Sequence, residues 1–327
     1  MFVRLFKTQN PLNLILLLIL AIGIRLPYLL DSNPIPVFHY NEPFSTFLFG
    51  KYSFLWENKL FNVLITTFIY YAVGLWLNKI VNDFSLIFKN THLPSLLFVI
   101  ITGIFPTFFT MDAAILIIFL QLWIFIRLFK LYKANQATIL SFDLGVIVSI
   151  ASLFYFPAIA WIVLVWIALL IFRPFNWREW TSSILGAITP YLFVAFFYFW
   201  VNRWDDFIIL WQPLKNYWQI NIFPKNSDYL PLIPMGLILI VSFNKLRENF
   251  YKNVLQVRKA QQLLIFSIII TAGSFYIKPS FSINHFILLA APITVFLSYY
   301  FLVAKRLWAS EGLILLMIAS AIFFQLY

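Results

Sequence analysis

Two short polar segments beside apolar runs hold the carboxylates and the histidine best suited to acid–base chemistry. His39 and Glu42 lie three residues apart in His-Tyr-Asn-Glu, and Asp112 stands between one apolar stretch and the next. Each of these side chains can act as a general base, and a carboxylate can instead hold a cation. A solvated loop would also explain His39 and Glu42, and a helix N-cap would explain Asp112.

Arg25, Lys278 and His285 are candidates for binding an anion. Arg25 stands near the end of the first apolar run, six residues before Asp31, and its guanidinium could hold a phosphate or orient a carboxylate. Lys278 and His285 flank the segment that leads into a later apolar run, where Lys278 could bind a phosphate as a point charge. The structural alternatives are an ion pair of Arg25 with Asp31, snorkelling of Arg25, and lipid-headgroup binding by Lys278.

The motifs that the chain lacks exclude several mechanisms. It has no Cys, which excludes disulfides, thiolate metal sites and a Cys nucleophile. It also has no Gly-rich phosphate loop, no His-x-x-x-His pair and no Gly-x-Ser-x-Gly elbow. Charged residues avoid the middle of the apolar runs, which disfavours an ion-driven carrier. No organic cofactor is indicated, and a divalent cation held by carboxylates stays open.

The elements that must position these residues are membrane spans. Hydrophobic residues make up 62% of the chain, charged residues only 11%, and the mean hydropathy is +0.89. A soluble domain has about a quarter charged residues. No hydrophilic stretch is long enough for a second domain, so we expect a single integral membrane domain over residues 1–327. The net charge of +11 does not indicate nucleic-acid binding, because the basic residues lie in short loops as topology signals and anionic-lipid contacts.

The lengths of the apolar runs predict an all-α polytopic membrane protein, because a bilayer core of about 30 Å needs about 20 helical residues. About eleven transmembrane helices are expected, at 11–30, 60–81, 94–109, 112–131, 140–155, 157–173, 182–201, 229–243, 262–277, 285–303 and 312–327. Pro157 directly follows Phe156, so the fifth and sixth runs could instead form one kinked helix or a re-entrant pair.

The charges of the connecting loops predict the orientation. With the N-terminus inside, sixteen of the 23 Lys and Arg fall on the cytoplasmic side, while seven of the 12 acids and two of the three His fall outside. The positive-inside rule therefore predicts an N-in, C-out topology. Merging the fifth and sixth runs would move one flanking basic loop outside, so the charges favour two separate spans.

Two outer loops are long and rich in aromatic residues. The first covers residues 31–59 and the fourth covers 202–228. Such segments are too short to span the bilayer and too apolar to lie in water. They predict interfacial helices in the first and fourth outer loops, and aromatic-belt anchors are the alternative.

The order of these motifs resembles the GT-C class of polytopic glycosyltransferases, especially the branch of the protein O-mannosyltransferases and aminoarabinose transferases. In that class the first span ends near an Arg and opens into an outer loop with a catalytic acid. An Asp stands at the outer start of a later span, and a Lys, a His or Tyr, a Leu-rich run and Ala-Pro follow. Over about residues 12–303 the matching segments are Ala21-Ile-Gly-Ile-Arg25-Leu-Pro-Tyr-Leu-Leu-Asp31, Asn41-Glu42, Met111-Asp112-Ala-Ala-Ile-Leu, the paired runs of 144–172, and Lys278…His285-Phe-Ile-Leu-Leu-Ala-Ala-Pro292.

The chain departs from this class in two respects. The first loop of the class commonly has adjacent acids, whereas Asn41-Glu42 stands here. The large soluble outer domain of many members is also missing. The chain resembles, in addition, a family of uncharacterised bacterial membrane proteins with the same architecture.

The resemblance implies transfer of a sugar from a polyprenyl-phosphate donor to an acceptor on the outer face of the bacterial cytoplasmic membrane. The implied substrate-binding residues are Arg25, His39, Lys278 and His285, and the implied catalytic residues are Glu42, Asp112 and Asp31. The donor phosphate would lie near Lys278. Glu42 or Asp31 would deprotonate the acceptor hydroxyl, and Asp112 would orient the acceptor, a metal or the base.

Two other functions fit the same composition. One is a non-catalytic membrane subunit or scaffold that docks protein partners of an envelope complex. The other is a flippase for lipid-linked material, which would need a wide polar cavity. Clustering of Arg25, Glu42, Asp112 and Lys278 around a cavity open to lipid would favour the transferase, and dispersal would favour the scaffold.

Overall fold

The computed structural model describes residues 2–30, 42–50, 56–211, 232–250, 253–277, 283–304 and 307–326, and this part of the chain contains helices and no strand. The α-helices are α1 (Phe2–Phe6), α2 (Leu12–Leu30), α3 (Pro43–Ser45), α5 (Lys59–Asp83), α6 (Leu93–Ile101), α7 (Ala113–Lys130), α8 (Ala137–Phe154), α9 (Trp161–Phe172), α10 (Trp177–Trp200), α11 (Trp204–Ile209), α12 (Leu232–Asn249), α13 (Leu255–Ser274), α14 (Ala290–Val303) and α15 (Leu307–Leu326). The shorter 3-10 and π-helical segments are η1 (Thr46–Gly50), η2 (Pro106–Phe109), η3 (Leu131–Lys133), η4 (Phe156–Ala160), η8 (Phe275–Ile277) and η9 (Ile283–Leu289).

Seven helical segments in the described residues are long and apolar enough to cross a membrane. They are Leu12–Leu30, Lys59–Asp83, Ala113–Lys133, Ala137–Phe154, Trp177–Trp200, Leu255–Ile277 and Ile283–Val303. Two shorter apolar helical segments, Phe156–Phe172 and Ser310–Phe323, accompany them. The chain thus has the helices expected of a multi-pass membrane protein.

The third predicted span, 94–109, is not one continuous helix. The α6 helix ends at Ile101, and a turn leads into the separate η2 segment. Pro106 stands at the start of η2, where the missing N–H of proline costs no helical hydrogen bond. The break places the residues before α7 in an extended conformation, and these residues include Asp112.

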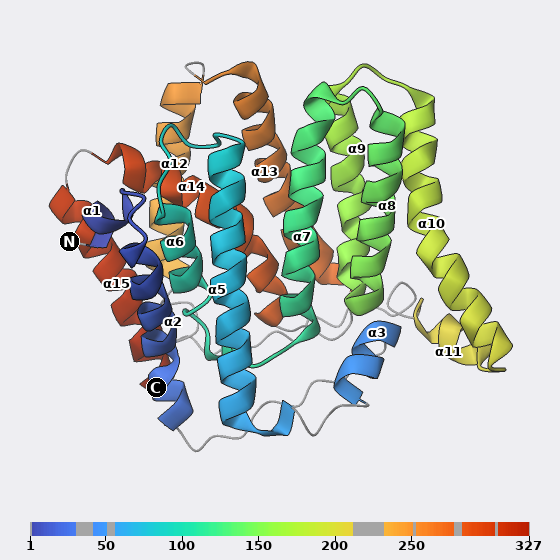
Figure 1. The fold of residues 1–327 in the computed structure, drawn as a ribbon, viewed down its shortest axis with the longest axis horizontal. Coiled ribbons are helices and arrows are strands. Elements are labelled where there is room, and N and C mark those ends of the chain that lie inside the picture. Colours follow the sequence, from blue (N-terminus) through green and yellow to red (C-terminus); the bar gives the residue numbers. More distant parts are fainter. Residues whose placement is uncertain are drawn as a thin grey trace.

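The fifth and sixth predicted spans are two separate helices. The α8 helix ends at Phe154, Tyr155 is extended, and η4 begins the second helix with Pro157 in its first turn. The two helices run in opposite directions (Figure 1). Pro157 excludes a continuous helix here, because its ring removes a backbone donor and restricts the residue before it.

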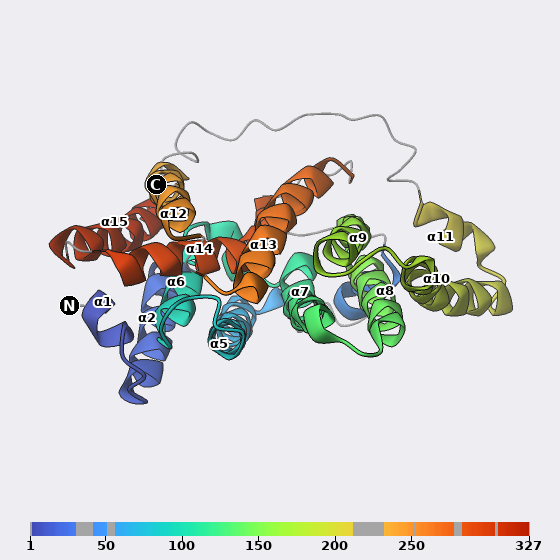
Figure 2. The ribbon, with the colours of Figure 1, turned by 90° about the horizontal axis from the view of Figure 1, so that it is seen from above.

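The helices are arranged in a row of upright elements with α14 crossing among them. In Figure 1, α2 and α15 lie at one side, α5 and α7 in the middle, and α8, α9 and α10 at the other side. Viewed from above, α7 lies beside the α8–α9 pair, and the far end of α10 leads away from the body to α11 (Figure 2).

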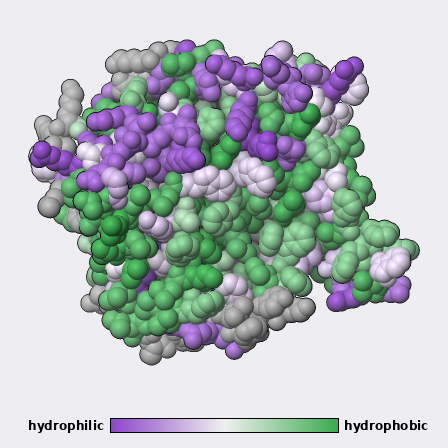
Figure 3. Space-filling view, in the orientation of Figure 1, coloured by the Kyte–Doolittle hydropathy of each residue, from purple (hydrophilic) through white to green (hydrophobic). Residues whose placement is uncertain are grey.

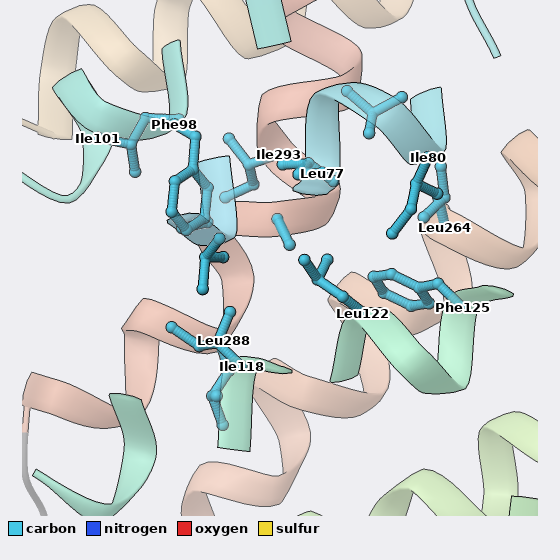
Figure 4. Close-up of a cluster of buried hydrophobic side chains, with 14 of the residues drawn as sticks. Leu77, Ile80, Phe98, Ile101, Ile118, Leu122, Phe125, Leu264, Leu288 and Ile293 are labelled. Carbon is cyan, nitrogen blue, oxygen red and sulfur yellow. The ribbon is translucent and has the colours of Figure 1, made fainter. Parts of the chain in front are cut away.

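The main core draws buried side chains from helices along the described chain, from α1 to α15. Figure 4 shows apolar side chains from α5, α6, α7, α13, η9 and α14 pointing toward one another. Its labelled members are Leu77, Ile80, Phe98, Ile101, Ile118, Leu122, Phe125, Leu264, Leu288 and Ile293. These contacts hold η9 against α7, and Gln121 adds a hydrogen bond from its Nε2 to the carbonyl of Leu288 at 2.8 Å.

Polar and apolar surface are separated along the long direction of the upright helices. Hydrophilic side chains gather along the top of the face in Figure 3, whereas hydrophobic ones cover its middle. The last turns of α7 and α12 and the first turn of α13 lie at that end (Figure 1) and carry Arg127, Arg247 and Arg258. Arg127 forms an ion pair with Asp143 at 3.4 Å, so acids share this basic end.

The α8 and α10 helices pack backbone against backbone. The Cα of Gly145 in α8 faces Ser183 and Ala187 of α10, and a Cβ atom on Gly145 would overlap the Ser183 carbonyl. Gly186 in α10 faces the backbone of Phe142 in the same way. Small residues at helix interfaces permit this approach in membranes, where packing and not water exclusion holds helices together.

Candidate functional site

Glu42 is a buried acid in the structure, not a solvated loop residue. Its side chain is 4% exposed, and Oε1 accepts a hydrogen bond from the backbone N–H of Phe156 at 3.2 Å. The α3 helix that follows Glu42 is docked on the end of α8. The Ser45 hydroxyl donates to the carbonyl of Phe154, and the Phe44 ring lies 5.1 Å from the Phe154 ring. This part of the first predicted outer loop therefore packs on protein.

Asp112 is the N-cap of α7, as the structural alternative predicted. Its Oδ1 accepts from the N–H of Ala113 at 2.6 Å. Its second oxygen has a long-range role, because Oδ2 accepts from Nδ2 of Asn284 at 2.9 Å. The backbone before the cap is fixed by Asn62 of α5, whose Oδ1 accepts from the N–H of Met111 at 2.7 Å. Asp112 thus links α7 to η9.

His285 is a buried residue of η9 with hydrogen bonds at both ring nitrogens. Its Nδ1 lies 3.0 Å from the Tyr155 hydroxyl, and its Nε2 lies 2.7 Å from the carbonyl oxygen of Thr271 in α13. The Ser274 hydroxyl is 3.4 Å from Nε2. The orientation of the His285 ring is therefore fixed by residues of α13 on one side and by Tyr155, at the α8–α9 break, on the other.

Glu42, Asp112, Tyr155, Asn284 and His285 together form what we call the Tyr155 cluster. Asp112 bonds to Asn284, the adjacent His285 bonds to Tyr155, and the N–H of the residue after Tyr155 bonds to Glu42. Segments that are up to 243 residues apart in sequence (42 and 285) thus meet in one buried region.

The Tyr155 cluster has the groups required for acid–base chemistry. It contains two carboxylates, an imidazole and a phenol, all nearly excluded from solvent. Burial strengthens electrostatic interactions and favours proton sharing between such groups. Within the described ranges, no group of three or more His, Asp or Glu is placed to hold a metal ion.

Arg25 is buried elsewhere in the bundle, in α2. One guanidinium nitrogen donates to the carbonyl of Ala21 at 2.8 Å, and the other lies 3.1 Å from the Thr102 hydroxyl oxygen. The guanidinium carbon is 5.2 Å from the ring centres of both Tyr70 and Phe109. These contacts join α2 to α5, α6 and η2. They give Arg25 a packing role, and its side chain has no solvent exposure.

We expect Arg25→Ala to lower the free energy of unfolding by about 3 kcal/mol or more. The change removes two buried cation–π contacts and leaves a cavity where a large side chain stood. Thermal unfolding of the detergent-solubilised protein measures this effect. Arg178→Ala is the matched control, because Arg178 forms an exposed cation–π contact with Trp177 at 5.9 Å. An Arg25→Ala protein with unchanged stability but weaker binding of polyprenyl phosphate would instead assign Arg25 to the substrate.

Three predicted site residues lie outside the described part of the chain. They are Asp31, His39 and Lys278. The predicted catalytic pair Glu42 and Asp112 and the predicted ligand His285 are placed in the Tyr155 cluster. Arg25 instead contacts Thr102, Tyr70 and Phe109.

Sequence reasoning did not identify Tyr155, Asn284 or Asn62. Tyr155 immediately precedes Phe156-Pro157 at the break between two apolar runs, and this position could have marked it. Asn284 stands next to His285 as a second polar residue at the start of an apolar run. Asn62 had a weaker signal, since it is one polar residue within a long predicted span.

The comparisons with known proteins match one family. The family model described as "Family of unknown function (DUF6427)" matches residues 44–327. No curated protein and no solved structure matches the chain.

Proposed function

Because the chain belongs to this family, whose description leaves function open, we propose a function from the chain's own residues. The protein is a GT-C-like membrane transferase that moves a sugar from a polyprenyl-phosphate donor to an acceptor on the outer face of the bacterial cytoplasmic membrane. The observation that carries this proposal is the meeting of Glu42, Asp112 and His285 in one buried region, through their hydrogen bonds to Phe156, Asn284 and Tyr155. Of the four residues whose clustering would favour a transferase over a scaffold, Glu42 and Asp112 meet in this cluster, Arg25 is buried elsewhere in the bundle, and Lys278 lies outside the described residues.

The proposed topology has about eleven spans, with the N-terminus inside and the C-terminus outside. Each predicted apolar run overlaps a helical element, although α6 and α9 are short. The basic end of the bundle supports the inner assignment, because cytoplasmic loops are enriched in Lys and Arg. The Tyr155 cluster involves the start of α3, the start of α7 and the α8–α9 break, which lie toward the opposite end (Figure 1).

The α11 helix supports an interfacial segment in the fourth outer loop. The rings of its aromatic residues Trp204 and Phe207 are tilted against each other, with their centres 5.1 Å apart. Arg203 and Asp206 pair at 2.6 Å beside them, on an exposed surface. An apolar side next to a neutralised polar side suits a helix in the headgroup region.

The proposed reaction is a single displacement at the sugar. The Glu42 carboxylate takes the proton of the acceptor hydroxyl while the acceptor oxygen bonds to the anomeric carbon. The bond from that carbon to the phosphate oxygen breaks, and its electron pair leaves with polyprenyl phosphate. Attack opposite the leaving group inverts the anomeric centre. Asp112 orients the acceptor or the base, and Lys278, which lies outside the described residues, is the proposed cation for the phosphate.

The direct test uses the purified full chain in proteoliposomes. Polyprenyl-phosphate hexoses are supplied as donors and isolated envelope material as the acceptor. We expect release of free polyprenyl phosphate and incorporation of labelled sugar, both measured by mass spectrometry. Neither product would form if the protein is a scaffold, and in that case protein partners rather than glycan products would be recovered with it.

A further inference from the structure

The contacts of His285 determine where its protons lie. The carbonyl oxygen of Thr271 can only accept a hydrogen bond, so the Nε2 atom 2.7 Å away carries a proton. In the neutral imidazole Nδ1 is then the acceptor, and the Tyr155 hydroxyl, 3.0 Å away, donates to it. His285 is therefore held as the Nε2–H tautomer.

This tautomer directs the basic nitrogen of His285 at one side chain. Nδ1 faces the Tyr155 hydroxyl, and Nε2 is engaged by the protein backbone. The ring is 1% exposed overall and is flanked by the Phe275 ring at 5.6 Å. Any proton that reaches Nδ1 along this contact must pass through the hydroxyl of Tyr155.

The surroundings of Tyr155 contain the groups that could supply such a proton. In the described part of the chain, the carboxylates of this region are Glu42, which accepts from the N–H of the residue after Tyr155, and Asp112, which accepts from the residue before His285. The α13 side of the pair offers Thr271 and Ser274, which do not titrate near neutral pH.

We propose that Tyr155 is a positioning residue that relays a proton between the carboxylates of the Tyr155 cluster and Nδ1 of His285. This inference rests on the proposed transferase function. Glu42 takes the acceptor proton during transfer and must lose it before the next cycle. The Tyr155 oxygen receives a proton from the carboxylate side as its own proton moves to Nδ1. His285 becomes an imidazolium and Glu42 is again a base. When the products leave, Nδ1 returns this proton through Tyr155 to the carboxylate side and on to water that enters the vacated site, so each cycle releases one proton and leaves His285 neutral.

The relay changes the role expected of His285. A substrate-binding histidine would present a ring nitrogen to the donor phosphate, whereas both nitrogens here are directed at protein groups. His285 therefore acts through Tyr155 as the proton acceptor of the site.

The first test is a histidine NMR measurement on the full chain and does not depend on activity. The chain has only three His, so ¹⁵N-histidine labelling yields three imidazoles, which His39→Gln and His92→Gln assign by elimination. We expect His285 at neutral pH to show a protonated Nε2 and an unprotonated Nδ1. Tyr155→Phe should shift the Nδ1 resonance to that of a nitrogen with no hydrogen-bond donor, and Tyr71→Phe should not. A protonated Nδ1, or an Nδ1 shift unaffected by Tyr155→Phe, would overturn the pairing.

The second test separates the relay from the transferase itself. In the proteoliposome assay, Tyr155→Phe should lower the transfer rate about 10-fold, less than loss of a direct acid–base group, and should change the pH dependence of the rate. Tyr71→Phe is the control, because its hydroxyl bonds to the Leu14 carbonyl. An active wild type whose rate and pH profile are unchanged by Tyr155→Phe refutes the relay. An inactive wild type with the expected NMR spectrum refutes the transferase and leaves the hydrogen-bonded pair in place.

Discussion

Glu42→Gln lowers the rate of sugar transfer about 100-fold or more, the loss typical of a general base. The amide of Gln has almost the same shape as the carboxylate. Its oxygen can still accept the N–H of Phe156, which lies 3.2 Å from Oε1 in the native protein, so the docking of α3 is retained. The amide cannot take a proton from an acceptor hydroxyl. The loss should therefore fall on turnover and not on folding.

The measurement is the release of polyprenyl phosphate by proteoliposomes of equal protein content, with thermal unfolding recorded in parallel. Glu57→Gln is the matched control, because Glu57 is an exposed carboxylate two residues before α5. It should change the rate less than about twofold, as expected for a surface substitution. Transfer by Glu42→Gln at the native rate would remove Glu42 from the mechanism. Loss of both rate and stability would show that the residue acts in folding.

The lengths of the apolar runs and the positions of the prolines were sufficient to predict most of the helices. The break at Pro157 is local, since proline removes its own hydrogen bond and restricts Phe156, and two helices follow. The interruption of the third run was not predicted. An apolar stretch of 16 residues (94–109) satisfies a hydropathy criterion whether or not its backbone is continuous, and the turn after Ile101 depends on packing.

The site could be predicted only in part, for a physical reason. Glu42, Asp112 and His285 are ionisable residues at the edges of apolar runs, and the cost of burying charge makes such positions informative. Tyr155 and Asn284 are uncharged, so the cost of burying charge does not single them out in the sequence. Their roles depend on contacts between distant segments. Arg25 shows the converse. As an arginine at the end of an apolar run, it was predicted to bind an anion. Its cation–π partners come from α5 and η2 and could not be inferred from its neighbours in sequence.

The close packing of α8 on α10 leads to a large expected effect on stability. A Cβ at position 145 would overlap the Ser183 carbonyl and lie 2.7 Å from the backbone nitrogen of Ala187. Both obstacles are main-chain atoms of a helix and cannot turn aside as a flexible side chain could. The two helices would have to separate, and Gly186, which meets Phe142 in the same way, would lose its own close contact.

Gly145→Val should therefore lower the free energy of unfolding by about 3 kcal/mol or more, at the upper end of overpacking effects. Thermal unfolding of the detergent-solubilised protein measures the change. Gly23→Val is the matched control, because a Cβ on this glycine of α2 meets nothing within 4 Å. Equal stability of the two variants would mean that α8 and α10 do not meet at these glycines.

The effect of Gly145→Val should extend to the Tyr155 cluster. The end of α8 accepts the hydrogen bond from Ser45 and leads into Tyr155, and Ser152 of α8 bonds to Tyr191 of α10 at 2.7 Å. Helix separation at Gly145 should thus reduce transfer even under conditions where the variant remains folded.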